Sequence, residues 1–89
     1  MKVLISKKAF KFINSLNDPY LKFIHSKIQF LINSLEHSDI SALSNIDIKV
    51  LHGELNGFYR IRFGKFRLIC SISLNNLTIE TIDFRGNIY

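Results

Sequence analysis

The pattern of hydrophobic and polar positions changes its period about halfway along this chain. Before residue 36, apolar side chains recur at the spacing of one helix face. From Ile46 onward, β-branched and aromatic residues alternate with polar ones, as they do in strands with one buried face. The first half is therefore predicted to be mainly helical, and the second half is predicted to form a sheet.

A short strand and two helices are predicted in the first half. The segment 2–6, "KVLIS", reads as the strand, and Ser6 is a suitable N-cap for the first helix. Asp18 is then predicted as the N-cap of a second helix, with Pro19 as its first residue and an end near Leu35. The apolar stripes of the two helices comprise Ala9, Phe10, Ile13 and Leu16, followed by Leu21, Ile24, Ile28, Leu31 and Leu35.

The second half contains four strand-like segments joined by short turns. The strands read "IDIKVLH", "FYRIRF", "FRLICSIS" and "LTIETIDF", and a polar connection over 37–47 precedes them. The intervening "GELNG", "GK" and "NN" are plausible turns, so the strands form an antiparallel meander. We therefore predict a single α+β domain over residues 1–89. Its N-terminal strand and helical hairpin pack on one face of a twisted antiparallel β-sheet, and the other face is open and basic.

Composition and charge narrow the class of protein. The net charge of +5 favours an anionic partner, whether nucleic acid, a membrane surface or an acidic protein segment. No signal-peptide pattern and no bilayer-spanning stretch is present, so we expect a cytoplasmic protein. Cys70 is the only cysteine and lies in an apolar run, which indicates a core residue. The three histidines lack the spacing of a metal site.

The segment 58–68, "FYRIRFGKFRL", predicts a hairpin with two different faces. Gly64 and Lys65 suit a two-residue type II′ turn, which would pair Arg62 directly with Arg67. Arg60, Arg62 and Arg67 would then share one face. The opposite, core-facing side of the hairpin would carry Tyr59, Ile61, Phe63, Phe66, Leu68 and Cys70.

The shared face of the arginines needs an explanation, because like charges directly opposite each other destabilise a sheet. One interpretation is a solvated outer face. The other is a site for a phosphate-type ligand, formed by Arg60, Arg62 and Arg67 with Lys65 at the adjacent turn. We favour the phosphate site. His52 precedes a glycine at a strand end and is a possible further contact.

The last strand carries apolar residues in two alternation phases, so a β-bulge is predicted near Glu80 and Thr81. With the bulge, Arg85 would emerge on the open face beside Arg67. Gly86 would let the chain turn and bring Tyr89 to the rim of that face. The apolar residues that the bulge would bring to one face are Leu77, Ile79, Ile82 and Phe84.

These segments carry a resemblance to a known family. The run "VLHGELNGFYRIRFGKFRLICSI", followed by "IDFRGNIY", resembles the RelE/ParE superfamily of bacterial type II toxins. In that family a leucine, a basic residue and a glycine precede a "YRIR" strand. A "YRLIY"-like strand follows, and a terminal "HR" leads to a closing tyrosine. The corresponding positions are Leu51 to Gly53, Tyr59 to Arg62, Phe66 to Cys70, and Phe84, Arg85 and Tyr89.

The resemblance implies an activity, partners and residue roles. RelE-like members cleave messenger RNA on the ribosome without a metal or other cofactor, and an antitoxin with an acidic segment neutralises them. By this resemblance, Arg67 and Arg85 hold the scissile phosphate. Arg60 and Arg62 stabilise charge or assist proton transfer, and Tyr89 stacks on a nucleotide or transfers a proton.

Two departures from the family pattern leave the general base open. Phe84 stands where many relatives have a histidine, and Arg60 and Arg62 stand where some ribonucleases have lysines. The 2′-hydroxyl could instead be activated by electrostatic stabilisation of its alkoxide. Side-chain candidates for the base are Tyr89, Lys65 and His52. A ParE-like gyrase poison and a degenerate toxin that only binds its antitoxin are the alternative functions.

Overall fold

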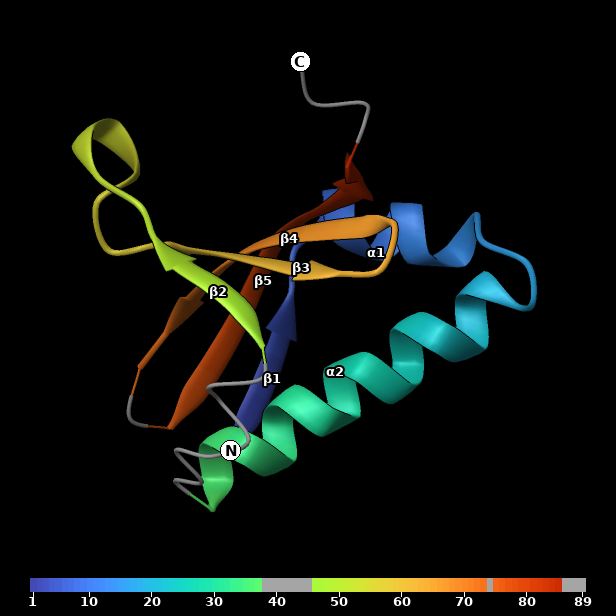
Figure 1. Ribbon diagram of the computed structural model, residues 1–89, viewed down its shortest axis with the longest axis horizontal. Helices are drawn as coiled ribbons and strands as arrows, with labels where there is room; N and C mark the ends of the chain where they lie inside the picture. Colours follow the sequence, from blue (N-terminus) through green and yellow to red (C-terminus); the bar gives the residue numbers. More distant parts are fainter. Residues whose placement is uncertain (38–45, 74, 86–89) are drawn as a thin grey trace.

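The computed structural model describes residues 1–37, 46–73 and 75–85, and it is an α+β fold as predicted (Figure 1). The predicted connection over 37–47 falls largely outside these ranges. Within them, no helix is long and apolar enough to cross a membrane. In chain order the elements are β1 (Lys2–Ile5), α1 (Lys7–Asn14), α2 (Tyr20–Glu36), β2 (Asp47–Val50), the 3₁₀ turn η1 (Gly53–Leu55), β3 (Tyr59–Phe63), β4 (Phe66–Ile72) and β5 (Asn76–Phe84).

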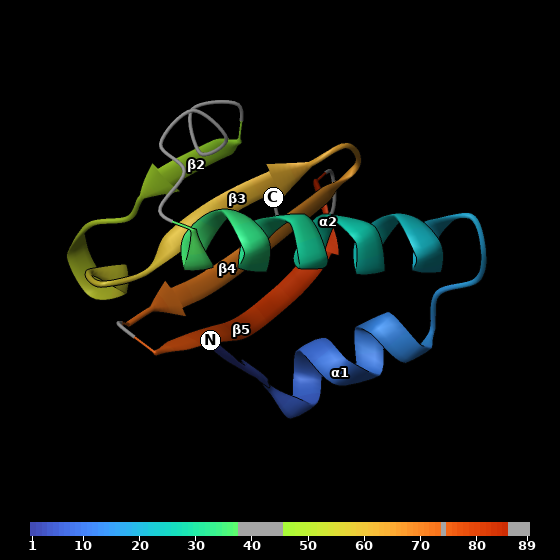
Figure 2. The ribbon, with the colours of Figure 1, turned by 90° about the horizontal axis from the view of Figure 1, so that it is seen from below.

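The five strands form one sheet in the order β1-β5-β4-β3-β2. The last four strands are antiparallel neighbours, which confirms the predicted meander. Strand β1 lies at the edge and pairs with β5 in parallel, so the sheet is mixed. Both helices lie on one side of the sheet, with α2 running along β3 and β4 (Figure 2). No helix of the described residues lies on the opposite face of the sheet.

The two helices begin in different ways. Ser6 is the N-cap of α1, as predicted, and its Oγ accepts a hydrogen bond of 3.0 Å from the backbone N–H of Ala9. The prediction that Asp18 caps the second helix is wrong. Because α2 begins at Tyr20, Pro19 occupies the cap position and Asp18 lies one residue too early. The Asp18 carboxylate instead lies 3.7 Å from Lys22 Nζ, one helical turn away.

The β3–β4 hairpin has the predicted register. Phe63 lies opposite Phe66, and Arg62 lies opposite Arg67. Gly64 has a φ of +56°, the positive value that both favoured two-residue hairpin turns require at their first central position. The predicted bulge in β5 is also confirmed, because Ile69 pairs with Thr81 and Cys70 with Ile79, which leaves Glu80 as the extra residue.

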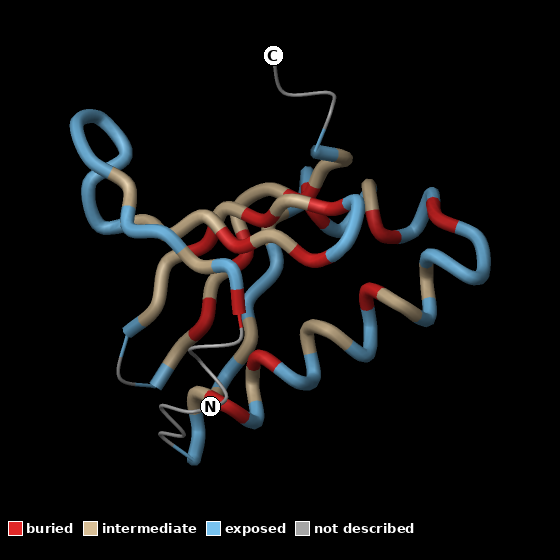
Figure 3. The backbone as a smooth tube through the Cα atoms, in the orientation of Figure 1, coloured by how far each residue is buried: buried red, intermediate tan, exposed pale blue. Residues whose placement is uncertain are grey.

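The core lies between the sheet and the helices. Buried and partly buried positions alternate along β3 and β4, as expected for strands with one covered face (Figure 3). Phe66 is fully buried near the turn, at the centre of an aromatic cluster. Its ring is stacked on Phe84 at 5.0 Å between centroids and on Phe23 at 6.0 Å. Phe12 and Tyr20 complete the cluster with edge contacts. This cluster ties both helices to the hairpin.

We predict that Gly64→Ala destabilises the fold more than Gly53→Ala. Both glycines have positive φ values, so alanine costs each about 1–2 kcal/mol. Only at Gly64 would the added Cβ also come within 2.9 Å of Phe23 Cζ, so the Phe23 ring would have to shift from its stacked position on Phe66. Urea unfolding of the two variants tests this. Equal losses of stability would show that the contact with Phe23 contributes nothing.

Candidate functional site

The candidate site is the sheet face opposite α1 and α2, which no helix covers in the described part of the chain. All four arginines of the chain lie in β3, in β4 or just after β5. Arg60 and Arg62 alternate along β3 with the core residue Ile61, so both point to the open side, and Arg67 joins them from β4. The structure thus brings together the three strand arginines that the sequence predicted on this face.

A row of four charged residues crosses this face, and we call it the charged rung. It runs from Asp47 on β2 to Arg62 on β3, then to Arg67 on β4 and Asp83 on β5, each directly opposite the next. The like-charged arginine pair is therefore flanked by a carboxylate on either side, which offsets the repulsion that such a pair creates. An anionic ligand is not needed for the arginine pair to be tolerated in the sheet.

Asp47 contacts two arginines at once. Arg60 Nη2 donates a hydrogen bond of 2.8 Å to Asp47 Oδ1, and Arg62 Nη1 lies 3.9 Å from Asp47 Oδ2. The side chains of Arg60 and Arg62 are only 13% and 29% exposed, whereas the Asp47 side chain is 52% exposed. Within the described part of the chain, the Nε atoms of both arginines are buried without a hydrogen-bond partner. The stems of these side chains are therefore packed, whereas their tips lie near Asp47, which binds Arg60 by a hydrogen bond and lies within ion-pair distance of Arg62.

The sequence prediction missed both aspartates of the charged rung. A signal for Asp47 existed, because Ile46, Ile48 and Val50 alternate with Asp47 and Lys49 and would put the latter two on the arginine face. The pairing of β2 with β3 was needed to place Asp47 opposite Arg62. That register follows an eight-residue connection, from residue 51 to residue 58, which fixes no register by itself.

Arg85 lies at the β3–β4 turn. Its Nη1 donates a hydrogen bond of 3.2 Å to the carbonyl oxygen of Gly64, and its backbone N–H donates one of 2.8 Å to the carbonyl of Lys65. The Lys65 ammonium lies on the helix side of the turn, where it donates to the Tyr20 hydroxyl at 3.4 Å and lies 5.8 Å from the centre of the Tyr20 ring. Arg85 is thus held at the β3–β4 turn, at one end of the sheet, and the Lys65 side chain lies toward the helices.

His52, a further predicted site residue, does not join this group. His52 is exposed just before η1, beyond the end of β2 at Val50, whereas the charged rung crosses β2 at the opposite end, at Asp47. In Figure 1 the β2–β3 connection and the β3–β4 turn lie at opposite ends of the sheet. Tyr89 lies outside the described residues. Phe84, at the family's histidine position, stacks on Phe66 in the aromatic cluster on the helix side.

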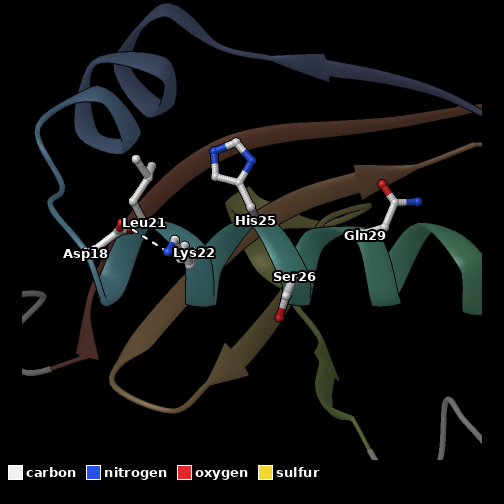
Figure 4. Close-up of a pocket in the computed structure, with 6 residues that line it drawn as sticks. All are labelled: Asp18, Leu21, Lys22, His25, Ser26 and Gln29. Carbon is white, nitrogen blue, oxygen red and sulfur yellow. Dashed lines mark ion pairs between the residues drawn. The ribbon is translucent and has the colours of Figure 1, made fainter.

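A surface pocket lies on the helix side and is formed by α2 and the turn before it (Figure 4). Figure 4 shows the Asp18–Lys22 ion pair at one end, with Leu21 and His25 directed toward the α1 side. A second pocket between α1 and α2 shares His25 and Gln29 with it. The residues that line the first pocket are Asp18, Leu21, Lys22, His25, Ser26 and Gln29, so the pocket is separate from the arginine face.

Comparison with solved structures supports the fold. The YoeB dimer from Staphylococcus aureus is similar with a TM-score of 0.71 at 25% identity, covering 96% of this chain and 97% of that one. The toxin–antitoxin complex RelBE2 from Mycobacterium tuberculosis gives 0.67 at 22% identity, covering 94% and 96%. YafQ from E. coli gives 0.70 at 12% identity, covering 99% and 97%.

No protein-family model matches the sequence, and no curated protein matches it significantly. The structural likenesses span nearly the whole chain in each case. They confirm the RelE-like toxin fold that the sequence resemblance implied.

We predict that Cys70 is unreactive in the folded protein. The residue is fully buried, and this burial raises the pKa of its thiol to about 12, so almost no thiolate is present near neutral pH. The reaction with a thiol reagent at pH 8 should be much slower for native protein than for protein in urea. Similar rates in both states would contradict the buried position.

Proposed function

We propose that this protein is the toxin of a type II toxin–antitoxin pair and cleaves messenger RNA on the ribosome. The observation that carries the proposal is the gathering of Arg60, Arg62 and Arg67 on the open face of a RelE-like sheet, with the fourth arginine of the chain, Arg85, at the β3–β4 turn. Arginine binds phosphate through a planar fork of donors and remains charged at any physiological pH. The eight lysines lie mostly elsewhere on the chain, so this part of the molecule is enriched in arginine rather than in basic residues generally.

The proposed reaction is an attack by the ribose 2′-oxygen on the adjacent phosphorus. The new P–O2′ bond forms as the P–O5′ bond breaks, which yields a cyclic phosphate and a 5′-hydroxyl. Three demands follow: stabilisation of the added negative charge, removal of the 2′ proton and protonation of the leaving 5′-oxygen. Arg67 and Arg85 would hold the scissile phosphate, and Arg60 and Arg62 would stabilise the charge that develops.

The positions of the candidate general bases limit which of them can remove the 2′ proton. Arg60 and Arg62 are poor bases, because a guanidinium remains protonated at physiological pH. Lys65 contacts Tyr20 on the helix side, and His52 lies at the far end of the sheet from the charged rung. We therefore assign activation of the 2′-hydroxyl to electrostatic stabilisation of the alkoxide by the arginines, with Tyr89 as the candidate for proton transfer.

The proposed partner is an antitoxin with an acidic segment. Support comes from the net charge of +5 and from the uncovered arginine face, which an acidic chain would neutralise. RelBE2, one of the structures with a similar fold, was solved as a toxin–antitoxin complex. An acidic segment seated on Arg60 to Arg67 would also exclude RNA from the same donors.

We predict that induction of the protein without an antitoxin stops growth and produces new messenger 5′-ends within translated codons. Arg67→Ala and Arg85→Ala should each abolish both effects, because each removes a contact to the scissile phosphate. Lys8→Ala is the matched control, since it removes one positive charge from the exposed side of α1. Growth curves and mapping of 5′-ends measure the two effects.

Other results would identify a different function. Growth arrest with intact messages contradicts the nuclease, and arrest with a sustained DNA-damage response would instead support a gyrase poison. Wild-type expression without any effect on growth would indicate a chain that only binds its antitoxin. Equal activity of Arg67→Ala and the wild type would contradict the assigned role of the arginine face.

A further inference from the structure

Asp47 occupies an unusual position for a carboxylate on a face that is proposed to bind phosphate. It is the acidic residue of edge strand β2, and its two oxygens are divided between Arg60 at 2.8 Å and Arg62 at 3.9 Å. A negative charge at this point opposes the approach of an anionic ligand. By its charge alone, Asp47 therefore weakens the binding of an anionic ligand. A carboxylate at this position is expected to contribute to the site in another way.

The contribution of Asp47 follows from the spacing of the two arginines. Arg60 and Arg62 lie two residues apart on the same face of β3, so their Cα atoms are separated by about 7 Å. Two guanidinium groups at this spacing repel each other and, without a partner between them, would point apart. The Asp47 carboxylate lies within reach of both and draws their tips together. Because both stems are largely buried, the tips are the part that Asp47 can fix.

Asp83, at the other end of the charged rung, contacts the backbone of its own strand. Its Oδ1 accepts a hydrogen bond of 2.9 Å from the backbone N–H of Phe84, the next residue along β5. One oxygen of that carboxylate is therefore engaged by its own strand. Asp47 makes its described side-chain contacts with the arginines of the neighbouring strand.

We propose that Asp47 is a positioning residue that holds Arg60 and Arg62 as one anion-binding pair. The inference rests on the proposed function for its effect on cleavage, whereas the effect on the two guanidinium groups stands without it. Asp47 reduces the affinity for RNA by its charge and increases the cleavage rate by fixing the donors where charge develops. A residue with only a structural role would not produce these opposite effects.

The fold tolerates the change that tests this proposal. The Asp47 side chain is half exposed on an edge strand, and the backbone pairing of Asp47 with Arg62 does not involve the carboxylate. Asparagine also keeps a side-chain oxygen that can accept the hydrogen bond from Arg60 Nη2. Asp47→Asn should therefore be folded, and thermal unfolding verifies this for each variant before activity is measured.

The experiment compares Asp47→Asn and Asp47→Glu with the control Asp18→Asn. Asp18 is also about half exposed and also pairs with a basic residue, but it lies at the start of α2, away from the arginine face. The control makes the same change in net charge. Cleavage of messenger RNA on purified ribosomes gives kcat and KM, and an uncleavable 2′-O-methyl oligonucleotide gives the affinity for RNA.

We expect Asp47→Asn to lower kcat by roughly 10-fold to 100-fold, as small displacements of catalytic groups do. Its KM should be unchanged or lower, and the oligonucleotide should bind more tightly than to the wild type. Asp47→Glu should recover much of kcat, and Asp18→Asn should match the wild type. Unchanged kcat in Asp47→Asn, or an equal loss in Asp18→Asn, would overturn the proposal.

An NMR measurement separates this proposal from the proposed function. Because the Nε atoms of Arg60 and Arg62 are buried, their N–H protons exchange slowly and give observable signals. In Asp47→Asn these signals should move toward the position of solvated arginine, and in Asp18→Asn they should not. If wild-type protein fails to cleave RNA, the nuclease proposal fails, yet these shifts still decide the role of Asp47. Identical spectra of wild type and Asp47→Asn would refute it.

Discussion

The register of the β3–β4 hairpin is the constraint on which both faces of this sheet depend. Strand side chains alternate between two faces, so a slip of one residue would send arginines into the core and aromatic rings into solvent. The turn at Gly64 sets the register, and the buried ring of Phe66 secures it from the helix side. The same register puts Arg62 opposite Arg67. The core and the basic face therefore both depend on this single register.

The charged rung resolves a conflict that this register creates. A pair of arginines directly opposite each other is unfavourable, and the outer strands supply Asp47 and Asp83 at the same level of the sheet. The rung is formally neutral, so the positive character of the face comes from basic residues outside it, among them Arg60 and Lys49, which lie opposite each other. Within the rung, the two aspartates offset the repulsion between Arg62 and Arg67.

Local signals in the sequence predicted much of the fold. The cap at Ser6, the turn at Gly64 and the bulge at Glu80 each depend on a few neighbouring residues, and all three are confirmed. The cap at Asp18 was also a local prediction, and it failed because the helix begins one residue later than the Asp-Pro pair indicates. Local patterns identify the kind of helix start better than the residue at which it occurs.

The sequence by itself determined which residues face the core and which arginines share the open face, because alternation along a strand is a property of the chain alone. Only the tertiary structure decided what lies beside them. The parallel pairing of β1 with β5 and the approach of Asp47 to Arg60 join residues that are distant or connected by a long loop. Such contacts depend on how the strands dock against one another. Docking in turn depends on packing of the whole core, so no short stretch of sequence predicts it.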